Sequence, residues 1–587
     1  MEINERMEAN EGMKANEGMD AKQRYLAKPW CKFYPPGVPE TVEIPPISLP
    51  CLFEQTADKY ASRVAIHFYG TNIKFQDLKD QVLRMANALS HLGVKKGDRV
   101  ALYLLNTPQF VISYLATLRL GAILTPISPV YTSPEVKHQL SDSGAKTVIC
   151  QDILFSNVEK TGLKLDHVIV TGIAEYLPWL KRALGKSLLG RVARDIEIPK
   201  VDLSAADGVH QFQDLLKRYP PTPPEVDLDP LTDLAVLPYT GGTTGPPKGA
   251  MLTHRNLLAT QRQTTAFWPV MEPGKEVIIA FLPFYHIYGQ IVAMVNSLFL
   301  GGTMVLFTTP DVDDIIDAID DRGATVLYGV PTFFEYLKEY HRTGQAGWKR
   351  LKLITCGADT LHEATITSWQ GRTGSKIMEG YGMTETTAVS HANPLGRGKV
   401  GSFGIPIPNV LAAVVDPDTN AFVPPGEVGE MVLRGPNMMG GYWQNPAETG
   451  RTLVDIDGDG WLKTGDLVRM DDEGYFFFYD RKKDLIKYKG YSVFARDIEE
   501  HLMKHPQIKA AGVIGVPDPT VGEIVKAVIV LQNEARGKLS EEDIVAYCRE
   551  GLAHYKVPRI IEFRGELPRT DVGKTSRREL REEVEAG

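Results

Sequence analysis

Short apolar runs alternate with amphipathic stretches of helical period along most of this chain. The apolar run Val100–Leu104 precedes a helical stretch at Gln109–Leu120, and the same succession recurs further along. Strands that alternate with helices pair in parallel, and a parallel sheet needs helices on both of its faces. The alternation therefore predicts an α/β fold with two doubly wound β/α subdomains, whose further strands are expected at Thr147–Cys150, Val168–Val170, Val277–Leu282, Thr303–Phe307, Thr325–Tyr328 and Leu351–Thr355.

The pattern changes twice in the last third of the chain. After Gly401 glycine, proline and short β-branched runs such as Leu411–Val415 predict a small antiparallel β unit. Beyond Arg481 a compact α+β pattern begins, with a helix expected at Ala495–Lys504. A chain of 587 residues is also too long for one hydrophobic core. We therefore expect a large N-terminal domain over residues 22–481 and a smaller α+β domain over residues 482–587.

The first 21 residues repeat with a period of six, with Met7, Met13 and Met19 in phase. Nothing in this segment can form a core, so it is predicted to be a disordered tail. The repeat leaves open whether translation starts at Met1 or at Met19.

Composition excludes several classes of function. A net charge of -8 and the lack of a Lys/Arg stripe argue against a nucleic-acid partner. The five cysteines lie far apart and form no CxxC pair, which favours a reducing cytoplasm over a disulfide framework or a zinc site. The most apolar stretch, Ile291–Phe307, is too short and too interrupted to span a membrane, and it is expected to be a buried helix followed by a strand.

One stretch is basic and leucine-rich. Residues 176–194 carry five Lys/Arg side chains and no acid. The pattern resembles a helix that lies on a membrane surface, although a surface helix that packs its leucines on the domain is the favoured interpretation. Peripheral membrane contact is therefore left open, as is a homodimer.

The segment Tyr239–Gly249, with the sequence YTGGTTGPPKG, carries the strongest chemical signal. It follows the apolar strand Leu234–Pro238 and precedes a helix expected from Asn256. Closely spaced glycines let backbone N–H groups point toward an anion, while threonine hydroxyls add donors and a lysine adds charge. The segment predicts a phosphate cradle that is not a Walker loop, formed by Thr240, Gly241, Gly242, Thr243, Thr244, Gly245 and Lys248.

This segment resembles the phosphate-loop signature of the adenylate-forming superfamily, which includes acyl-CoA synthetases, aryl-CoA ligases, luciferases and peptide-synthetase adenylation domains. Further motifs follow in the family's order, and the resemblance covers nearly the whole chain after about Pro29. It implies an enzyme that uses ATP, Mg²⁺ and coenzyme A.

The resemblance assigns nucleotide contacts to several residues. In the motif Glu379–Glu385 it implies that Thr384 contacts phosphate, that Tyr381 lies near adenine, and that Glu385 binds Mg²⁺ together with Thr244. Asp466 would accept the ribose hydroxyls, Arg481 would contact the ribose, and Lys483 matches a hinge about which the small domain moves. Further implied nucleotide contacts come from Glu379, Gly380, Gly357 and Ala358, although Asp359 and Thr360 depart from the family's Ala-Pro.

Other residues are implied in acyl transfer. Lys574 would bridge the carboxylate substrate and the α-phosphate, although the family's usual Ser-Gly-Lys is here Val572-Gly573-Lys574. His286 would lie beside the carboxylate, and Tyr288 would line the acyl pocket. The strand around Lys487, with Lys489 and Gly490, is implied near coenzyme A in the second half-reaction.

The expected activity is therefore AMP-forming ligation of a medium- or long-chain fatty acid to coenzyme A in the cytoplasm. The resemblance is greatest to bacterial and archaeal long-chain fatty-acid–CoA ligases. An aryl-CoA ligase of the coumarate type is the alternative, and a non-catalytic nucleotide- or lipid-binding protein is an alternative of another class. Chain length and aromatic preference are left open.

Overall fold

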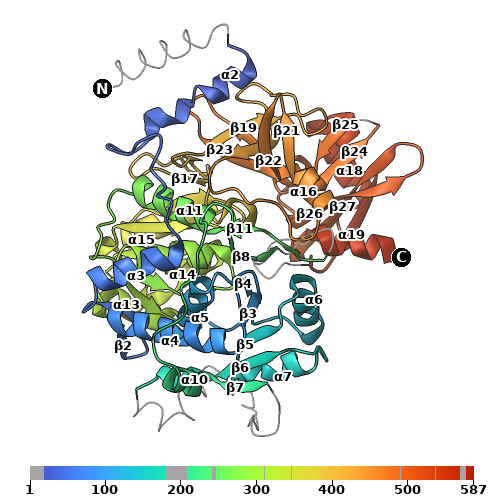
Figure 1. Cartoon of the computed structure of the whole chain (residues 1–587). Helices are drawn as coiled ribbons and strands as arrows, with labels where there is room; N and C mark the ends of the chain where they lie inside the picture. The colour runs from blue at the N-terminus through green and yellow to red at the C-terminus, as the bar shows by residue number, and fades with distance from the viewer. Residues whose placement is uncertain are drawn as a thin grey trace. The chain divides into compact units, whose positions relative to one another are not determined.

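The computed structural model describes residues 19–178, 208–240, 246–309, 311–345, 347–489, 491–535, 537–568 and 577–586. The chain forms two compact units (Figure 1). The large unit comprises Trp30–Leu411 and Leu433–Leu462. The small unit comprises the residues up to Pro29, Ala412–Val432 and the chain from Lys463 onward.

A nine-stranded sheet forms the centre of the large unit, in the order β18-β17-β16-β15-β14-β12-β13-β1-β2. All pairs from β16 to β1 are parallel, and only the strands at the two edges pair antiparallel. The strands are β1 (Val64–Phe68), β2 (Thr71–Lys74), β12 (Val277–Ala280), β13 (Thr303–Leu306), β14 (Val326–Gly329), β15 (Leu353–Cys356), β16 (Met378–Tyr381), β17 (His391–Ala392) and β18 (Ile405–Pro406).

A seven-stranded sheet in the order β11-β8-β4-β3-β5-β6-β7 is the second element of this unit. Only the edge pair β11·β8 is antiparallel. The two sheets confirm the predicted pair of doubly wound subdomains. The strands are β3 (Arg99–Tyr103), β4 (Ile123–Pro126), β5 (Thr147–Gln151), β6 (His167–Thr171), β7 (Val209–Gln211), β8 (Leu234–Val236) and β11 (Leu252–Thr253).

The helices of the large unit follow the hydrophobic pattern of the sequence. In α4 (Phe75–His91) the side chains of Leu78, Val82, Met85 and Leu89 are all buried. The remaining helices are α3 (Leu49–Lys59), α5 (Pro108–Arg119), α6 (Ser133–Ser143), α7 (Phe155–Glu159), α10 (Phe212–Arg218), α11 (His254–Phe267), α13 (Val312–Asp321), α14 (Pro331–Glu339), α15 (Glu363–Thr373) and α16 (Pro446–Thr452).

The apolar stretch 291–307 is a buried helical segment followed by strand β13, as predicted. Its first part, η4 (Gly289–Val295), is a π-helix that continues into α12 (Asn296–Phe299). All seven residues of η4 are buried. Among the described residues, no helix is long and apolar enough to cross a membrane.

The antiparallel β unit predicted after Gly401 is a five-stranded sheet in the order β19-β20-β22-β21, with β23 also paired to β22. Its strands are β19 (Leu411–Val415), β20 (Val428–Arg434), β21 (Leu453–Ile456), β22 (Asp459–Met470) and β23 (Phe476–Arg481).

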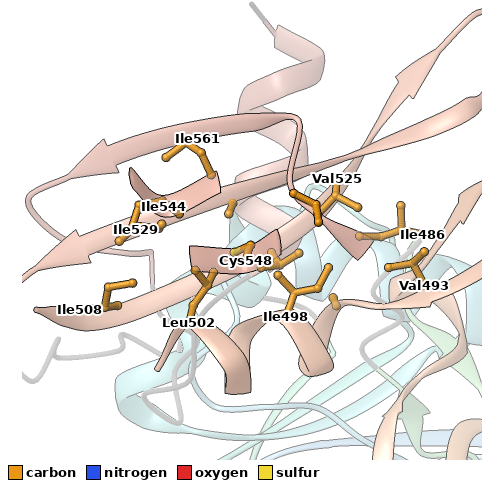
Figure 2. Packing of buried hydrophobic residues seen from close by; sticks show 14 of the residues in the cluster. Ile486, Val493, Ile498, Leu502, Ile508, Val525, Ile529, Ile544, Cys548 and Ile561 are labelled. Carbon is orange, nitrogen blue, oxygen red and sulfur yellow. The ribbon is translucent and has the colours of Figure 1, made fainter. Parts of the chain in front are cut away.

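The C-terminal part of the small unit has the predicted α+β fold. Its sheet has the order β25-β24-β27-β26, and β28 pairs parallel with β27. Ile498 and Leu502 of α17 (Ala495–Leu502) pack with Ile529 and Cys548 in one apolar cluster (Figure 2). The other elements are β24 (Leu485–Tyr488), β25 (Tyr491–Phe494), β26 (Ile508–Asp518), β27 (Gly522–Leu531), β28 (Ile560–Arg564), α18 (Glu541–Gly551) and α19 (Arg577–Ala586).

Three further sequence predictions concern the N-terminal tail, the basic stretch 176–194 and the cysteines. Residues 1–18 of the predicted tail lie outside the described residues, while Asp20 caps α2 (Ala21–Leu26) through Gln23. Residues 179–194 of the basic stretch also lie outside them, and Tyr176 ends the 3-10 turn η3 (Ile173–Tyr176). All five cysteines are free thiols.

Candidate active site

Four neighbouring parallel strands of the nine-stranded sheet, β16, β15, β14 and β12, end at the same edge. Predicted site residues lie in the segments after three of these ends: His286 follows β12, Gly357 comes directly after β15, and Thr384 follows β16. In open parallel sheets, ligands bind in the crevice outside the carboxyl ends of the strands. The topology therefore brings together residues that are distant in the sequence.

A pocket of about 490 Å³, including its solvent-open part, lies at this edge. Its lining is largely apolar and aromatic, as is common for small-molecule sites. The pocket brings together six residues singled out from the sequence, namely His286, Tyr288, Gly357, Ala358, Gly380 and Tyr381. It is completed by residues that include Trp268, Ile287, Val292, Tyr328, Met383 and Val389.

The ring of Tyr288 packs directly against the backbone of Gly357. A Cβ at Gly357 would lie 3.1 Å from the Tyr288 ring and hydroxyl, which is tighter than ordinary contact. The Tyr288 hydroxyl lies 3.4 Å from Oγ1 of Thr355, and burial raises the pKa of this phenol, so it stays neutral. Ala358, the next residue after Gly357, has a φ of +73°, a strained value for a residue with a side chain.

The environment of His286 favours the neutral form of its imidazole. Its side chain is accessible to solvent, yet the surrounding protein lowers its pKa below the ordinary value by desolvation. The backbone N–H of Tyr288 donates to Nδ1 of His286 over 3.2 Å. In the neutral ring the proton therefore lies on Nε2, which can donate to a ligand oxygen.

Glu385 lies in a tightly held loop between β16 and β17. The 3-10 turn η7 (Thr384–Thr386) is followed by Thr387 and Ala388 with φ values of 53° and 82°. The side-chain amide of Asn437 donates to the carbonyls of Thr386 (3.0 Å) and Val389 (2.9 Å), which holds this strained turn. The carboxylate of Glu385 is buried and accepts a hydrogen bond of 2.6 Å from the Tyr442 hydroxyl.

Glu379 is a buried carboxyl in strand β16 of the nine-stranded sheet. Burial raises its pKa to about 7, although the backbone N–H of Leu361 donates to Oε1 over 3.3 Å. Glu379 therefore exchanges its proton near neutral pH.

The predicted phosphate cradle is a β-hairpin. Strand β9 (Tyr239–Thr240) pairs antiparallel with β10 (Lys248–Gly249), so Thr240 lies opposite Lys248. Nζ of Lys248 forms an ion pair of 2.7 Å with Glu448. The connecting residues Gly241, Gly242, Thr243, Thr244 and Gly245 lie outside the described residues.

In the small unit, Asp466 and Arg481 are cross-strand partners on β22 and β23. Their side chains form an ion pair of 2.8 Å, with Asp466 buried and Arg481 half exposed. The guanidinium of Arg481 offsets the charge of the buried Asp466 carboxylate, whose oxygens can accept hydrogen bonds from hydroxyls.

The other predicted residues of the small unit are exposed or outside the described residues. Lys483 is exposed in the turn η8 (Lys482–Asp484), and Lys489 is exposed with a φ of 49°. Nζ of Lys487 pairs with Asp418 over 2.7 Å. Gly490 and Lys574 lie outside the described residues.

The donor set around Glu385 fits Mg²⁺ better than a transition metal. Among the described residues, no group of three His, Cys, Asp or Glu side chains could hold a metal. Mg²⁺ commonly takes only one or two carboxylates and completes its shell with phosphate oxygens and water. A single buried carboxylate, linked through Tyr442 to the hairpin residue Lys248, is consistent with that requirement.

Sequence reasoning missed four residues. Trp268 and Tyr328 line the pocket, whereas Tyr442 and Glu448 contact Glu385 and Lys248. The glycine pair before Tyr442 was a usable signal for a close backbone approach. Nothing local distinguishes Trp268 from an ordinary core aromatic.

The parallel sheets and the pocket at the strand ends define an α/β protein of two units with a site for a small ligand. Comparison with known proteins identifies the family. The AMP-binding enzyme family matches residues 53–443, and the C-terminal domain of AMP-binding enzymes matches residues 497–574. The chain belongs to the AMP-binding enzyme family, as its resemblance predicted.

Individual relatives span almost the whole chain. A long-chain-fatty-acid–CoA ligase of Bacillus subtilis is 38% identical over 562 residues, 95% of this chain and 98% of the relative. A feruloyl-CoA synthase of an Amycolatopsis species is 32% identical over 521 residues, 88% of this chain and 95% of the relative. The ATP-bound MatB structure from Rhodopseudomonas palustris superposes with a TM-score of 0.76 at 30% identity, covering 92% of this chain and 99% of that one.

Proposed function

We propose that this protein is an ATP-dependent fatty-acid–CoA ligase that forms an acyl-adenylate and releases pyrophosphate. The observation that carries the proposal is the pocket at the carboxyl ends of β12, β14, β15 and β16, which joins segments that the family motifs separately single out. The long-chain-fatty-acid–CoA ligase from Bacillus subtilis supports the substrate class.

In the first half-reaction, an oxygen of the fatty-acid carboxylate attacks the α-phosphorus of ATP, and the bond to pyrophosphate breaks. The hairpin residues 240–245 and Lys248 would bind the departing phosphates, and Thr384 would hold a phosphate oxygen. Lys574 would stabilise charge on the α-phosphate, a task suited to a flexible ammonium. Mg²⁺ held by Glu385 and Thr244 would supply further neutralisation of phosphate charge.

The nucleoside end of ATP needs different groups. Asp466 would accept the ribose hydroxyls, with Arg481 beside it, consistent with their 2.8 Å ion pair. Tyr381, Gly380, Gly357 and Ala358 would contact the adenine, and Glu379 lies in the same strand β16.

In the second half-reaction, the thiol sulfur of coenzyme A attacks the acyl carbon, AMP leaves, and the thiol proton is released. Lys487, Lys489 and Gly490 would lie near coenzyme A, and His286 would lie beside the reacting carbonyl. Because Lys574 and Lys487 serve different steps, we propose that residues 482–587 rotate against residues 22–481 about Lys483.

The apolar lining favours an acyl chain, since Ile287, Val292 and Val389 offer no polar partner to a substrate. An aryl acid is the second candidate, because the rings of Trp268, Tyr288 and Tyr328 also face the pocket and the feruloyl-CoA synthase is a relative.

Pyrophosphate release with acids of graded chain length, next to benzoate and hydroxycinnamates, tests the proposal. Release that rises with chain length and requires coenzyme A for turnover is expected. Preference for aromatic acids would favour the aryl-CoA ligase. No release with any acid would favour a non-catalytic nucleotide- or lipid-binding protein.

We place the reaction in the cytoplasm, where ATP, coenzyme A and reduced cysteines coexist. Peripheral membrane contact through residues 176–194 and a homodimer belong to the same proposal, whereas the acidic net charge of -8 argues against a nucleic-acid partner.

A further inference from the structure

Two chain segments meet beside Glu385 in a short ladder of backbone hydrogen bonds. The N–H of Trp443 donates to the Gly249 carbonyl over 2.8 Å, and the N–H of Met251 donates to the Gly441 carbonyl over 2.9 Å. The N–H of Met439 donates to the Glu385 carbonyl over 2.9 Å. Residues 439–443 are therefore held against both the end of the phosphate hairpin and the Glu385 loop.

The ladder places the Tyr442 side chain between two groups of opposite charge. Its hydroxyl donates to Oε1 of Glu385 over 2.6 Å, and both side chains are buried. On its ring lies Nζ of Lys248, 5.5 Å from the centroid. A hydrogen bond to a charged acceptor is short and about twice as strong as a neutral one, so it fixes the carboxylate rotamer.

Helix α16 holds both the backbone of Tyr442 and the cation on its ring. Glu448 in the first turn of α16 pairs with Lys248 over 2.7 Å, and the N–H of Tyr442 donates to Oγ1 of Thr449 over 2.9 Å. A ring fixed by its backbone, by a cation and by a carboxylate has little rotational freedom. That rigidity is what a side chain needs in order to orient another group.

We propose that Tyr442 is a positioning residue, which orients the Glu385 carboxylate toward the divalent cation that accompanies the nucleotide. The inference rests on the proposed function for the role of Glu385. Groups that hydrogen-bond to a ligating carboxylate set its direction, and their loss typically weakens metal affinity by about 10–100-fold. Tyr442 touches neither substrate nor metal and acts through Glu385.

Tyr442→Phe in the full chain removes the hydroxyl and keeps the ring against Lys248. The direct test is Mn²⁺ binding, counted by electron paramagnetic resonance, in the presence of an ATP analogue with a methylene bridge between the α- and β-phosphates. We expect the Kd for Mn²⁺ to rise about tenfold or more. Pyrophosphate release should need proportionally more Mg²⁺, while the KM for the acid stays unchanged and excess Mg²⁺ restores kcat.

Tyr103→Phe is the matched control. The Tyr103 hydroxyl also donates a 2.6 Å hydrogen bond, to the Tyr131 carbonyl, in the separate apolar cluster around β3. A Mn²⁺ affinity that is unchanged in Tyr442→Phe, or lowered equally in Tyr103→Phe, would overturn the inference.

A double-mutant cycle with Glu385→Gln separates action through Glu385 from general damage. If Tyr442 acts through this carboxylate, its loss has little further effect once the carboxylate is gone, so the two effects are not additive. Full additivity contradicts the inference. The Mn²⁺ measurement needs no acid substrate, so a wild-type protein that binds Mn²⁺ with nucleotide but never releases pyrophosphate contradicts the proposed function alone.

Discussion

The guanidinium of Arg577 donates from Nη1 to Oδ1 of Asp480 over 2.6 Å, across 97 residues of sequence. The same guanidinium pairs with Asp484 (3.2 Å) and Glu499 (2.5 Å). Asp480 precedes the proposed hinge Lys483, whereas the other two carboxylates follow it. A rotation about Lys483 must therefore break the pair between Asp480 and Arg577 while it spares the other two.

Arg577→Met should destabilise the small unit by about 3–5 kcal/mol, because it leaves three largely buried carboxylates without their shared cation. Denaturant unfolding followed by fluorescence measures the loss. The control is Arg342→Met, which removes a guanidinium paired with two half-exposed carboxylates and should cost far less stability, because solvent screens exposed ion pairs. Equal losses would contradict the importance of burial.

Asp480→Asn should loosen the turn η8 without removing the other two partners of Arg577. Losing a hydrogen bond to a charged group costs about 1.5–3 kcal/mol, so local opening should become at least about tenfold more frequent. Limited trypsin digestion measures this opening as the rate of cleavage after Lys482 and Lys483. Asp518→Asn, at the last residue of β26, should leave that rate unchanged. An unchanged rate in Asp480→Asn would show that the pair does not restrain the turn.

Lys574→Ala should abolish adenylation, because an ammonium that stabilises the α-phosphate is lost. Thioester formation from supplied acyl-adenylate and coenzyme A should continue, because the role proposed for Lys574 is confined to the first step. Pyrophosphate release and thioester absorbance measure the two half-reactions separately. An equal fall of both rates would contradict the division of roles.

Stability should depend on the pH through Glu379, whose pKa is raised by burial from 4.5 to about 7. Between these values the unfolded chain has lost the proton that the folded protein still holds. Stability therefore falls as the pH rises through this window, by roughly 3 kcal/mol in all, and the penalty is constant above it. Glu379→Gln should remove this slope in denaturant midpoints measured from pH 4.5 to 8. The same slope in both proteins would assign it to another group.

The strands and helices of this protein could be predicted because their signal is local. The apolar run Val100–Leu104 became β3 (Arg99–Tyr103), and Gln109–Leu120 became α5 (Pro108–Arg119), each within one residue. The π-helix Gly289–Val295 could not be predicted, since its extra residue per turn depends on packing around a fully buried segment rather than on composition.

The residues of the candidate site also fall into two groups, those that sequence motifs identified and those that only the structure revealed. Glu385, Tyr381, His286 and Lys248 stand in recognisable motifs, because each chemical task needs a particular residue type in a particular turn. No family motif in the sequence singled out Trp268, Tyr442 or Glu448. The tertiary structure shows that Trp268 lines the pocket, that Tyr442 contacts Glu385, and that Glu448 pairs with Lys248.

The sequence by itself determined the order of the strands and helices along the chain, the glycine/threonine segment Tyr239–Gly249 and the motifs of the AMP-binding enzyme family. Only the tertiary structure decided which distant side chains contact the carboxylates: the Tyr442 hydroxyl donates to Glu385, and the Arg577 guanidinium donates to Asp480. Backbone conformation depends on neighbours in the chain, whereas the direction of a buried carboxylate depends on donors that folding brings from far away.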